Sequence, residues 1–548
     1  MFKHSNLTQI KLFTSGNSLL SGKSLSIYED TNSWHNQFRV QVTSRIDETI
    51  FKPLFSNGTG CPNAPITVLI SMMVLKEAEG LSDQKLFESC RFNILTRSAI
   101  GLLNADDPLP SESTYYLFRK KIHDYAQEKG ENLFDTVFKD CTQGQSIDFE
   151  ISGKRIRMDS KLLGSNIAWL SRYELVHETL RVFYKNLRKD QKLDETTKDQ
   201  LSEILKFKGN KIVYTSTHSE ITNKFKELGV LIHNILTSYP SQDSTLQKVF
   251  EQQFVIIETD TVLPRDKQEI SAKSIQSPHD TDCHFRNKDG NKVKGYTINV
   301  TESCDDGQGL NLIGDVSVKK VSASDVDFLE QTVTSAQDVF VDQVENIHAD
   351  GAYHSESNQK FCSKNNMNLH LHAIQGAKSR YILTLLENNE LSVLDSKTNK
   401  LVEVTRIKSK KDIEKWRIKT EKGYRYFTQK EIDTATVRRK IEQTPIEILQ
   451  KRNNVEATIF QLGYHYSNNK SRYRGIIKHQ MWANMRCLWV NFVRILNFTT
   501  KVAVKTVFYQ KNSLKAFSKM LILDFSRFMS LKKMKLYQFT INRKFSNA

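Results

Sequence analysis

The apolar residues in the first quarter of the chain recur at helical spacing. Behind Pro65, four of them fall on one face of a helix: Leu69, Ile70, Met73 and Val74. Ser82 is a typical cap for the next helix, and a third helix is expected from about Ser113. The pattern predicts an α-helical N-terminal domain over residues 1–145, although residues 1–45 are polar and show little periodicity.

The pattern changes to alternation typical of strands from about residue 146. The expected elements are, in order, a hairpin over 148–158, strands over 292–301 and 310–318, a helix over 324–336, a strand over 344–350, a helix over 357–362 and a strand over 369–374. This order predicts an α/β fold, an RNase H-like catalytic core with inserted segments. Crossover helices between parallel strands place ligands at the carboxyl ends of the strands, where Asp159 and Asp350 are expected.

Two insertions are expected within a catalytic domain that spans residues 146–500. Residues 164–275 form a highly charged helical insertion, and residues 377–440 form a β-rich insertion with short strands over 381–385 and 424–427. A basic tail over 501–548 carries more than half of the net charge, since Asp524 is its only acid.

The overall charge of +17 and a pI near 9.3 indicate a polyanionic partner. No apolar run approaches the roughly 20 residues that span a bilayer, and the N-terminus has no secretory apolar region. Double-stranded DNA is therefore favoured over a membrane. The seven cysteines are scattered and never form a Cys-x-x-Cys pair, which favours the reducing cytoplasm over a disulfide framework or a structural zinc site. With DNA as the partner, we expect a cytoplasmic, nucleoid-associated protein.

Three acidic residues stand where a two-metal site needs them. Asp159 and Asp350 each end a short strand-like run, and Glu456 lies in an amphipathic helix predicted over 450–462. Carboxylates in these places can hold two divalent ions roughly 3.5–4 Å apart, with Mg²⁺ (or Mn²⁺) as the expected ions. The alternative for each acid is an ordinary surface or capping residue.

The surroundings of Glu456 resemble a known family. Arg452-Asn-Asn-Val-Glu456, with Tyr473-Arg-Gly475 and Asn491-Phe-Val-Arg494, resembles the C-terminal part of DDE transposases from bacterial insertion sequences. That family has a signature of Tyr, Arg, Glu and Lys. Arg452 and Glu456 match it, whereas Leu449 and Gly463 replace the Tyr and the Lys.

Segments upstream extend the resemblance to roughly residues 45–495. Asp159-Ser-Lys and Ala349-Asp-Gly-Ala-Tyr353 resemble the two Asp blocks of the family, and Pro110–Arg119 resembles the end of its helical domain. The resemblance implies metal-dependent cleavage and strand transfer at the ends of an insertion sequence, by a homo-oligomer in the DNA complex. It implies that Asp159, Asp350 and Glu456 are both catalytic residues and metal ligands.

Two alternatives use the same sequence features. One is an RNase H-like nuclease without strand transfer, and the other is a non-catalytic DNA-binding derivative, which the replaced signature positions leave open. The candidate DNA-binding residues are Arg119, Lys120, Lys121, Arg452, Arg472, Arg474 and Lys478. We expect the first three to be exposed on the helix from Ser113. For Arg452 the alternative is an ion pair with Glu456 one helical turn away.

Overall fold

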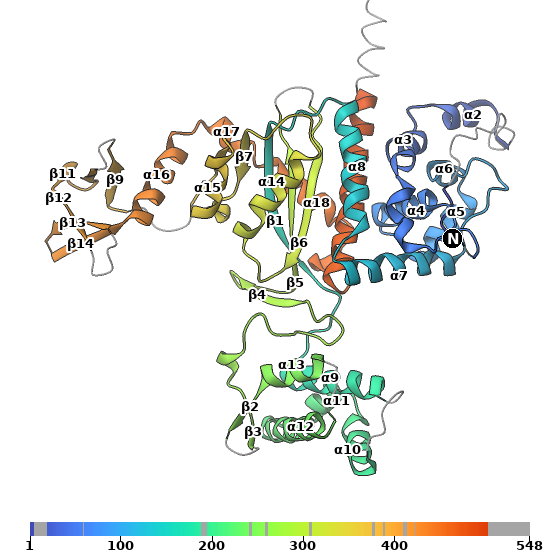
Figure 1. Cartoon of the computed structure of the whole chain (residues 1–548), viewed down its shortest axis with the longest axis horizontal. Helices are drawn as coiled ribbons and strands as arrows, with labels where there is room; N and C mark the ends of the chain where they lie inside the picture. Colours follow the sequence, from blue (N-terminus) through green and yellow to red (C-terminus); the bar gives the residue numbers. More distant parts are fainter. Residues whose placement is uncertain are drawn as a thin grey trace, which may run out of the picture.

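The computed structural model describes residues 1–4, 19–58, 60–187, 194–239, 244–257, 261–305, 309–374, 379–386, 390–408, 414–421 and 423–501. Residues 502–548 of the predicted basic tail therefore lie outside the described residues. A central sheet stands between the helical N-terminal domain and the β-rich insertion, and the helical insertion lies below it (Figure 1).

The centre is a six-stranded mixed sheet, so the predicted α/β class is confirmed. Its strands are β1 (Arg155–Gly164), β4 (His284–Lys288), β5 (Asn291–Ser303), β6 (Ile313–Lys320), β7 (Asn346–Ala349) and β8 (Asn368–Leu371). β5 pairs antiparallel with β1, β4 and β6, whereas β1, β7 and β8 run parallel. The four predicted strands after residue 290 all form.

The hairpin predicted over 148–158 is wrong. Helix α8 (Leu133–Asp148) ends only at the first residue of that range, and the Ile151 N–H donates a hydrogen bond to the carbonyl of Ser146 to close the helix end. Strand β1 then pairs with β5 as far as Gly164, so Asp159 lies in the middle of a strand and not at its end. Alternation by itself does not show where pairing stops, because pairing depends on the neighbouring strand.

The two faces of the sheet have separate hydrophobic cores. Ile156 and Met158 of β1 pack into one core with helices α14 (Leu329–Gln337) and α15 (Glu356–Lys364), which are close to the predicted ones. Leu163, on the opposite face, belongs to a second core with the N-terminal domain and the C-terminal helix over residues 476–501. Successive side chains of β1 therefore point alternately toward the two hydrophobic cores.

The N-terminal domain contains the predicted helices. They are α2 (Gly22–Glu29), α3 (Trp34–Gln41), α4 (Ile66–Glu79), α5 (Asp83–Phe92), α6 (Ile94–Ala99) and α7 (Glu112–Lys129), with α8 following. Ser82 caps α5 as expected, by accepting a hydrogen bond from the Lys85 N–H at 3.2 Å. Residue 145, the predicted end of the domain, falls inside α8.

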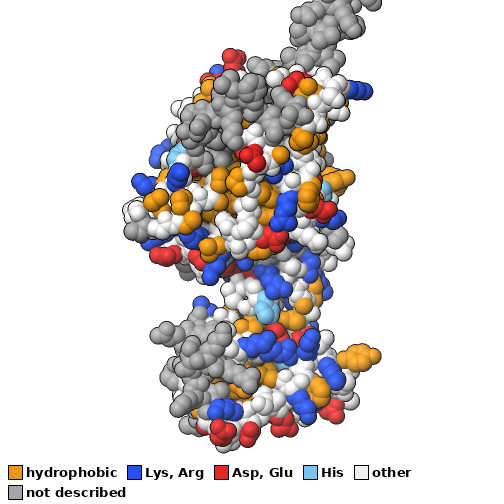
Figure 2. Space-filling view, turned by 90° about the vertical axis from the view of Figure 1, so that its right-hand side faces the viewer, with side chains coloured by type: hydrophobic (Ala, Val, Ile, Leu, Met, Phe, Trp, Pro, Cys, Tyr) orange, Lys and Arg blue, Asp and Glu red, His pale blue; other side chains and the backbone are white. Residues whose placement is uncertain are grey.

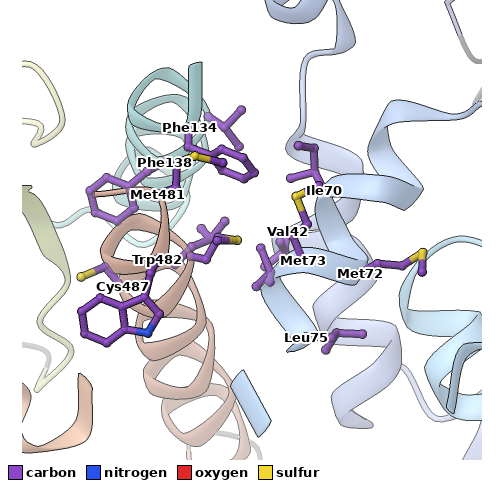
Figure 3. Close-up of a cluster of buried hydrophobic side chains, with 14 of the residues drawn as sticks. Val42, Ile70, Met72, Met73, Leu75, Phe134, Phe138, Met481, Trp482 and Cys487 are labelled. Atoms are coloured by element: carbon purple, nitrogen blue, oxygen red, sulfur yellow. The ribbon is translucent and has the colours of Figure 1, made fainter. Parts of the chain in front are cut away.

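This domain shares its core with the sheet. Side chains of α4, among them Ile70 and Met73, point toward α8 and the C-terminal helix, which contributes Met481 and Trp482 (Figure 3). Nearly every residue of α4 is buried. The N-terminal domain is therefore packed firmly against the body that carries β1 and β5.

Each insertion has a core of its own. The helical insertion consists of α9 (Arg172–Leu187), α10 (Glu195–Leu205), α11 (Gly209–Thr215), α12 (His218–Ser238), α13 (Ser244–Gln253), β2 (Phe254–Ile257) and β3 (Thr261–Pro264). Figure 2 shows it joined to the rest of the molecule by a narrow waist, around which Lys and Arg side chains gather.

The β-rich insertion consists of β9 (Tyr381–Leu385), β10 (Leu391–Asp395), β11 (Lys400–Val402), β12 (Val404–Lys408), β13 (Glu414–Thr420), β14 (Gly423–Thr428) and α16 (Gln429–Gln443). Its two predicted strands, over 381–385 and 424–427, both form. In the part of the chain that the structure describes, no helix combines the length and the apolar character needed to cross a membrane.

Candidate functional site

Asp159 lies on β1, and Asp350 directly follows the neighbouring parallel strand β7. Arg157 of β1 stands opposite His348 of β7, and each acid follows two residues later, Asp159 within β1 and Asp350 just past the end of β7. Because side chains alternate, both acids belong to the same face of the sheet. Burial raises the pKa of the Asp159 carboxyl, Arg452 opposes that rise, and the nearby charge of Asp350 adds to it.

Glu456 approaches the same face from helix α18 (Asn454–Leu462), which packs against β1. The helix predicted over 450–462 is wrong in its first part. Helix α17 (Ile446–Gln450) ends before a turn, and α18 starts only at Asn454. In this turn the carbonyl of Lys451 accepts a hydrogen bond from Arg157 Nη1 at 3.1 Å instead of continuing a helical ladder.

Arg452 joins two of the acids. Its Nη2 atom lies 2.8 Å from Asp159 Oδ2 and 3.3 Å from Glu456 Oε1. The ion pair with Glu456 that we considered as the alternative is therefore present, but it is only half of the arrangement. The Arg452 side chain is 12% exposed, and its buried Nε has no hydrogen-bond partner among the described residues.

The structure thus brings the three predicted acids to one region of the sheet, but with a guanidinium among them. No group of three His, Cys, Asp or Glu side chains within the described residues is arranged to hold a metal ion. Arg452 contacts both Asp159 and Glu456, which accounts for this physically. The Glu456 side chain is 62% exposed, so it is free to rotate away from Arg452.

A buried acid that the sequence analysis missed ties these elements together. Glu302 of β5 is fully buried and accepts hydrogen bonds from Arg157 Nε at 2.6 Å, Thr458 Oγ1 at 2.7 Å and Arg494 Nη1 at 2.7 Å. Burial acts to raise the pKa of Glu302, yet these partners hold it below its ordinary value. The available signal was its position: Glu302 continues the alternate positions of the apolar residues Ile298 and Val300 in β5, on a buried face where an acid needs partners.

Asp350 is followed by a close approach of two backbones. A Cβ atom on Gly351 would lie 1.5 Å from the carbonyl oxygen of Ala373, so only glycine fits. The short helix η5 (Gly351–Tyr353) then buries Tyr353, whose hydroxyl bonds to Asn299 and Ser160 behind the acids. These contacts fix the turn that carries Asp350.

The expectation that Arg119, Lys120 and Lys121 are all exposed is wrong for two of them. Arg119 forms an ion pair with Asp83 at 3.4 Å, and Lys121 donates to the Leu54 carbonyl at 3.2 Å. Helix α7 packs against its neighbours on both sides, so these long side chains are used within the domain. Lys120 is exposed.

The later candidates lie where the N-terminal domain meets the C-terminal helix. Arg472 donates to the Leu81 carbonyl at 2.7 Å, and the exposed Arg474 donates to the Asn166 carbonyl at 2.7 Å. Lys478 lines a cavity of about 330 Å³ together with Arg119 and Lys120. The fold thus gathers candidate cations from two distant segments around one hollow.

Comparisons with known proteins identify both ends of this arrangement. A family model described as Transposase domain (DUF772) matches residues 26–121, and a model described as Transposase DDE domain matches residues 408–496, which include Arg452 and Glu456. Neither a curated protein nor a solved structure matches the chain. DDE transposases act on DNA and generally use divalent metal ions. The two transposase domains, in this order in one chain, support a DDE transposase of an insertion sequence.

Proposed function

We propose that this transposase cleaves DNA at the ends of its insertion sequence and joins those ends to target DNA, with Asp159, Asp350 and Glu456 as the metal ligands. The observation that carries the proposal is the convergence of the three acids from β1, β7 and α18, with Arg452 between two of them. The strand order β6-β5-β1-β7-β8, with parallel pairing from β1 onward, supports an RNase H-like core.

The donor set suits Mg²⁺ or Mn²⁺, because both ions prefer carboxylate oxygens. Two bound ions would supply activation of the attacking hydroxyl and stabilisation of the leaving oxygen. Burial and, to a smaller extent, repulsion from Asp350 raise the pKa of Asp159, and a cation beside Asp159 would offset both effects. Metal ions bound by Asp159 and Glu456 would compete with Arg452 for both carboxylates, and its planar guanidinium would then suit a DNA phosphate.

Phosphate contacts elsewhere hold the DNA in place. Lys120 and Lys478 are exposed beside the cavity between α7 and the C-terminal helix, and we propose that they contact the backbone of the element end. We also propose that the protein acts as a homo-oligomer that processes both element ends together. The intact set of acids favours an enzyme over a non-catalytic derivative, despite Leu449 and Gly463.

The test uses the full chain, a duplex carrying the element end and Mg²⁺. We expect Asp159→Asn, Asp350→Asn and Glu456→Gln each to abolish cleavage while DNA binding persists. Glu414→Gln, an exposed acid of the β-rich insertion, is the matched control and should cleave normally. Undiminished cleavage by Asp350→Asn would contradict the proposal, and cleavage without joining would indicate a nuclease.

A further inference from the structure

Lys161 is a half-buried cation beside the acids. It follows Asp159 by two residues on β1, so both side chains stand on one face of the sheet. Within the described part of the chain, its amine forms no hydrogen bond or ion pair. By contrast, the guanidiniums of Arg157 and Arg494 on this face are both paired with Glu302.

The amine of Lys161 lies at the end of helix α18. A Cβ atom on Gly463 would lie 3.3 Å from Lys161 Nζ. Position 463 is the one at which the signature has a lysine, so this chain brings an amine to the same space from β1. The two residues are 302 positions apart in sequence, and only the packing of α18 on β1 reveals the substitution.

Half-burying a cation that has no partner costs free energy unless an anion from outside the chain pairs with it. The acids nearby are already engaged, since Asp159 and Glu456 contact Arg452. Side chains two residues apart on a strand are separated by roughly 6.6–6.8 Å, which places Lys161 next to any group bound at Asp159. The anion that a transposase brings to this place is a DNA phosphate.

We propose that Lys161 binds a backbone phosphate of the DNA at the active site and replaces the signature lysine that Gly463 lacks. This inference rests on the proposed function, because it assumes that the DNA lies across Asp159. Gly463 has φ −92°, a conformation open to any residue, so a lysine can be introduced there.

The experiment compares Lys161→Met, Lys161→Arg and the double variant Lys161→Met/Gly463→Lys in the full chain. DNA affinity is measured without metal as a function of salt, and single-turnover cleavage is measured with Mg²⁺. Lys161→Met should weaken binding by about tenfold and reduce the log–log salt slope by about 0.9, as for one lost phosphate contact. Lys161→Arg and the double variant should both recover affinity. Lys360→Met, an exposed lysine of α15, is the control and should change neither quantity.

Parental binding by a folded Lys161→Met variant would overturn the proposal. So would a loss that neither the arginine nor the relocated lysine restores, because that result indicates a packing role. Thermal unfolding checks that each variant folds. Since binding is measured without metal, its result stands whether or not the acid variants lose cleavage, and the two proposals fail separately.

A second surface carries an independent inference. In the sheet β12-β13-β14, alternation buries Trp416 and Ile418 and leaves the other face of β13 with Lys415, Arg417 and Lys419. On the adjacent edge strand, Tyr424 and Tyr426 stand beside Lys419 and Arg417 and are 56% and 48% exposed.

No Asp or Glu stands on this face within the three strands, all of whose residues are described. Glu414 is on the opposite face, paired with Arg406, and Glu403 precedes β12. The three cations stand at every second residue of β13 and together extend over roughly 13 Å. One strand of duplex DNA presents about four phosphates over that length.

We infer that this face binds the backbone of duplex DNA without reading its sequence. In the full chain without metal, neutralising Lys415, Arg417 and Lys419 to Gln should lower affinity for any duplex and reduce the salt slope by up to about 2.7. The control neutralises Lys400, Arg406 and Lys408, which belong to the same insertion and not to this face. An unchanged slope, or a loss confined to one sequence or to single strands, would overturn the inference.

Discussion

Replacing Glu302 should loosen the part of the fold that carries Glu456. The Glu302→Gln change keeps the shape of the side chain but removes the charge that Arg157 and Arg494 share at 2.6 and 2.7 Å. Glu302 is fully buried, and the two arginine side chains are 7% and 20% exposed. In Glu302→Gln, water therefore solvates poorly the two guanidiniums that have lost their carboxylate partner.

The expected loss of stability is about 3–5 kcal/mol, the usual cost of breaking a buried ion pair by removing one partner. The exposed pair of Glu414 and Arg406 sets the comparison, since Glu414→Gln should cost less than about 1 kcal/mol. The effect should also depend on pH. The folded state holds the pKa of Glu302 below its ordinary value of 4.5, so the stabilisation is complete above that pH and is lost as pH falls further.

Hydrogen exchange measured by mass spectrometry suits this test, because a chain with several cores does not unfold in one transition. Peptides from β5 and α18 should exchange faster in Glu302→Gln, whereas the helical insertion, with a core of its own, is the internal control. If β5 and α18 exchange in Glu302→Gln as they do in Glu414→Gln, the buried network does not hold the site together.

Three further predictions concern single residues. Burial raises the pKa of Asp315 to about 6. Ionisation of a carboxyl with a raised pKa destabilises the fold, so the free energy of unfolding should fall by about 3 kcal/mol between pH 4 and 6. Denaturation of Asp315→Asn should not show that loss. Gly351→Ala must displace the Ala373 carbonyl, so it should destabilise the fold by about 1–3 kcal/mol in thermal unfolding and slow DNA cleavage. An unchanged melting temperature would refute the close approach. Arg452→Lys should cleave more slowly in single-turnover assays, because an ammonium lacks the planar fork that matches a DNA phosphate, and a parental rate would contradict that role.

Much of the local structure followed from the sequence. The helices of the N-terminal domain and strand β5 formed as predicted, because their periodicity states which side of each element is buried. The order of Asp159, Asp350 and Glu456 was also visible, since each stands beside a short motif. The two expectations that failed most clearly, the hairpin and the exposure of Arg119 and Lys121, both depended on neighbours that the pattern does not name.

The end of α8 shows why. Its last turns are held by contacts such as the hydrogen bond from Gln145 Nε2 to the Gln41 carbonyl at 2.9 Å, which no local pattern announces. The same holds for the site, where Glu302 finds its partners on three other elements and Lys161 lies beside Gly463. The sequence by itself determined which residues carry charge and which face of an element is apolar. The tertiary structure decided which charges meet, because the register of β1 with β5 and the packing of α18 on β1 set those distances.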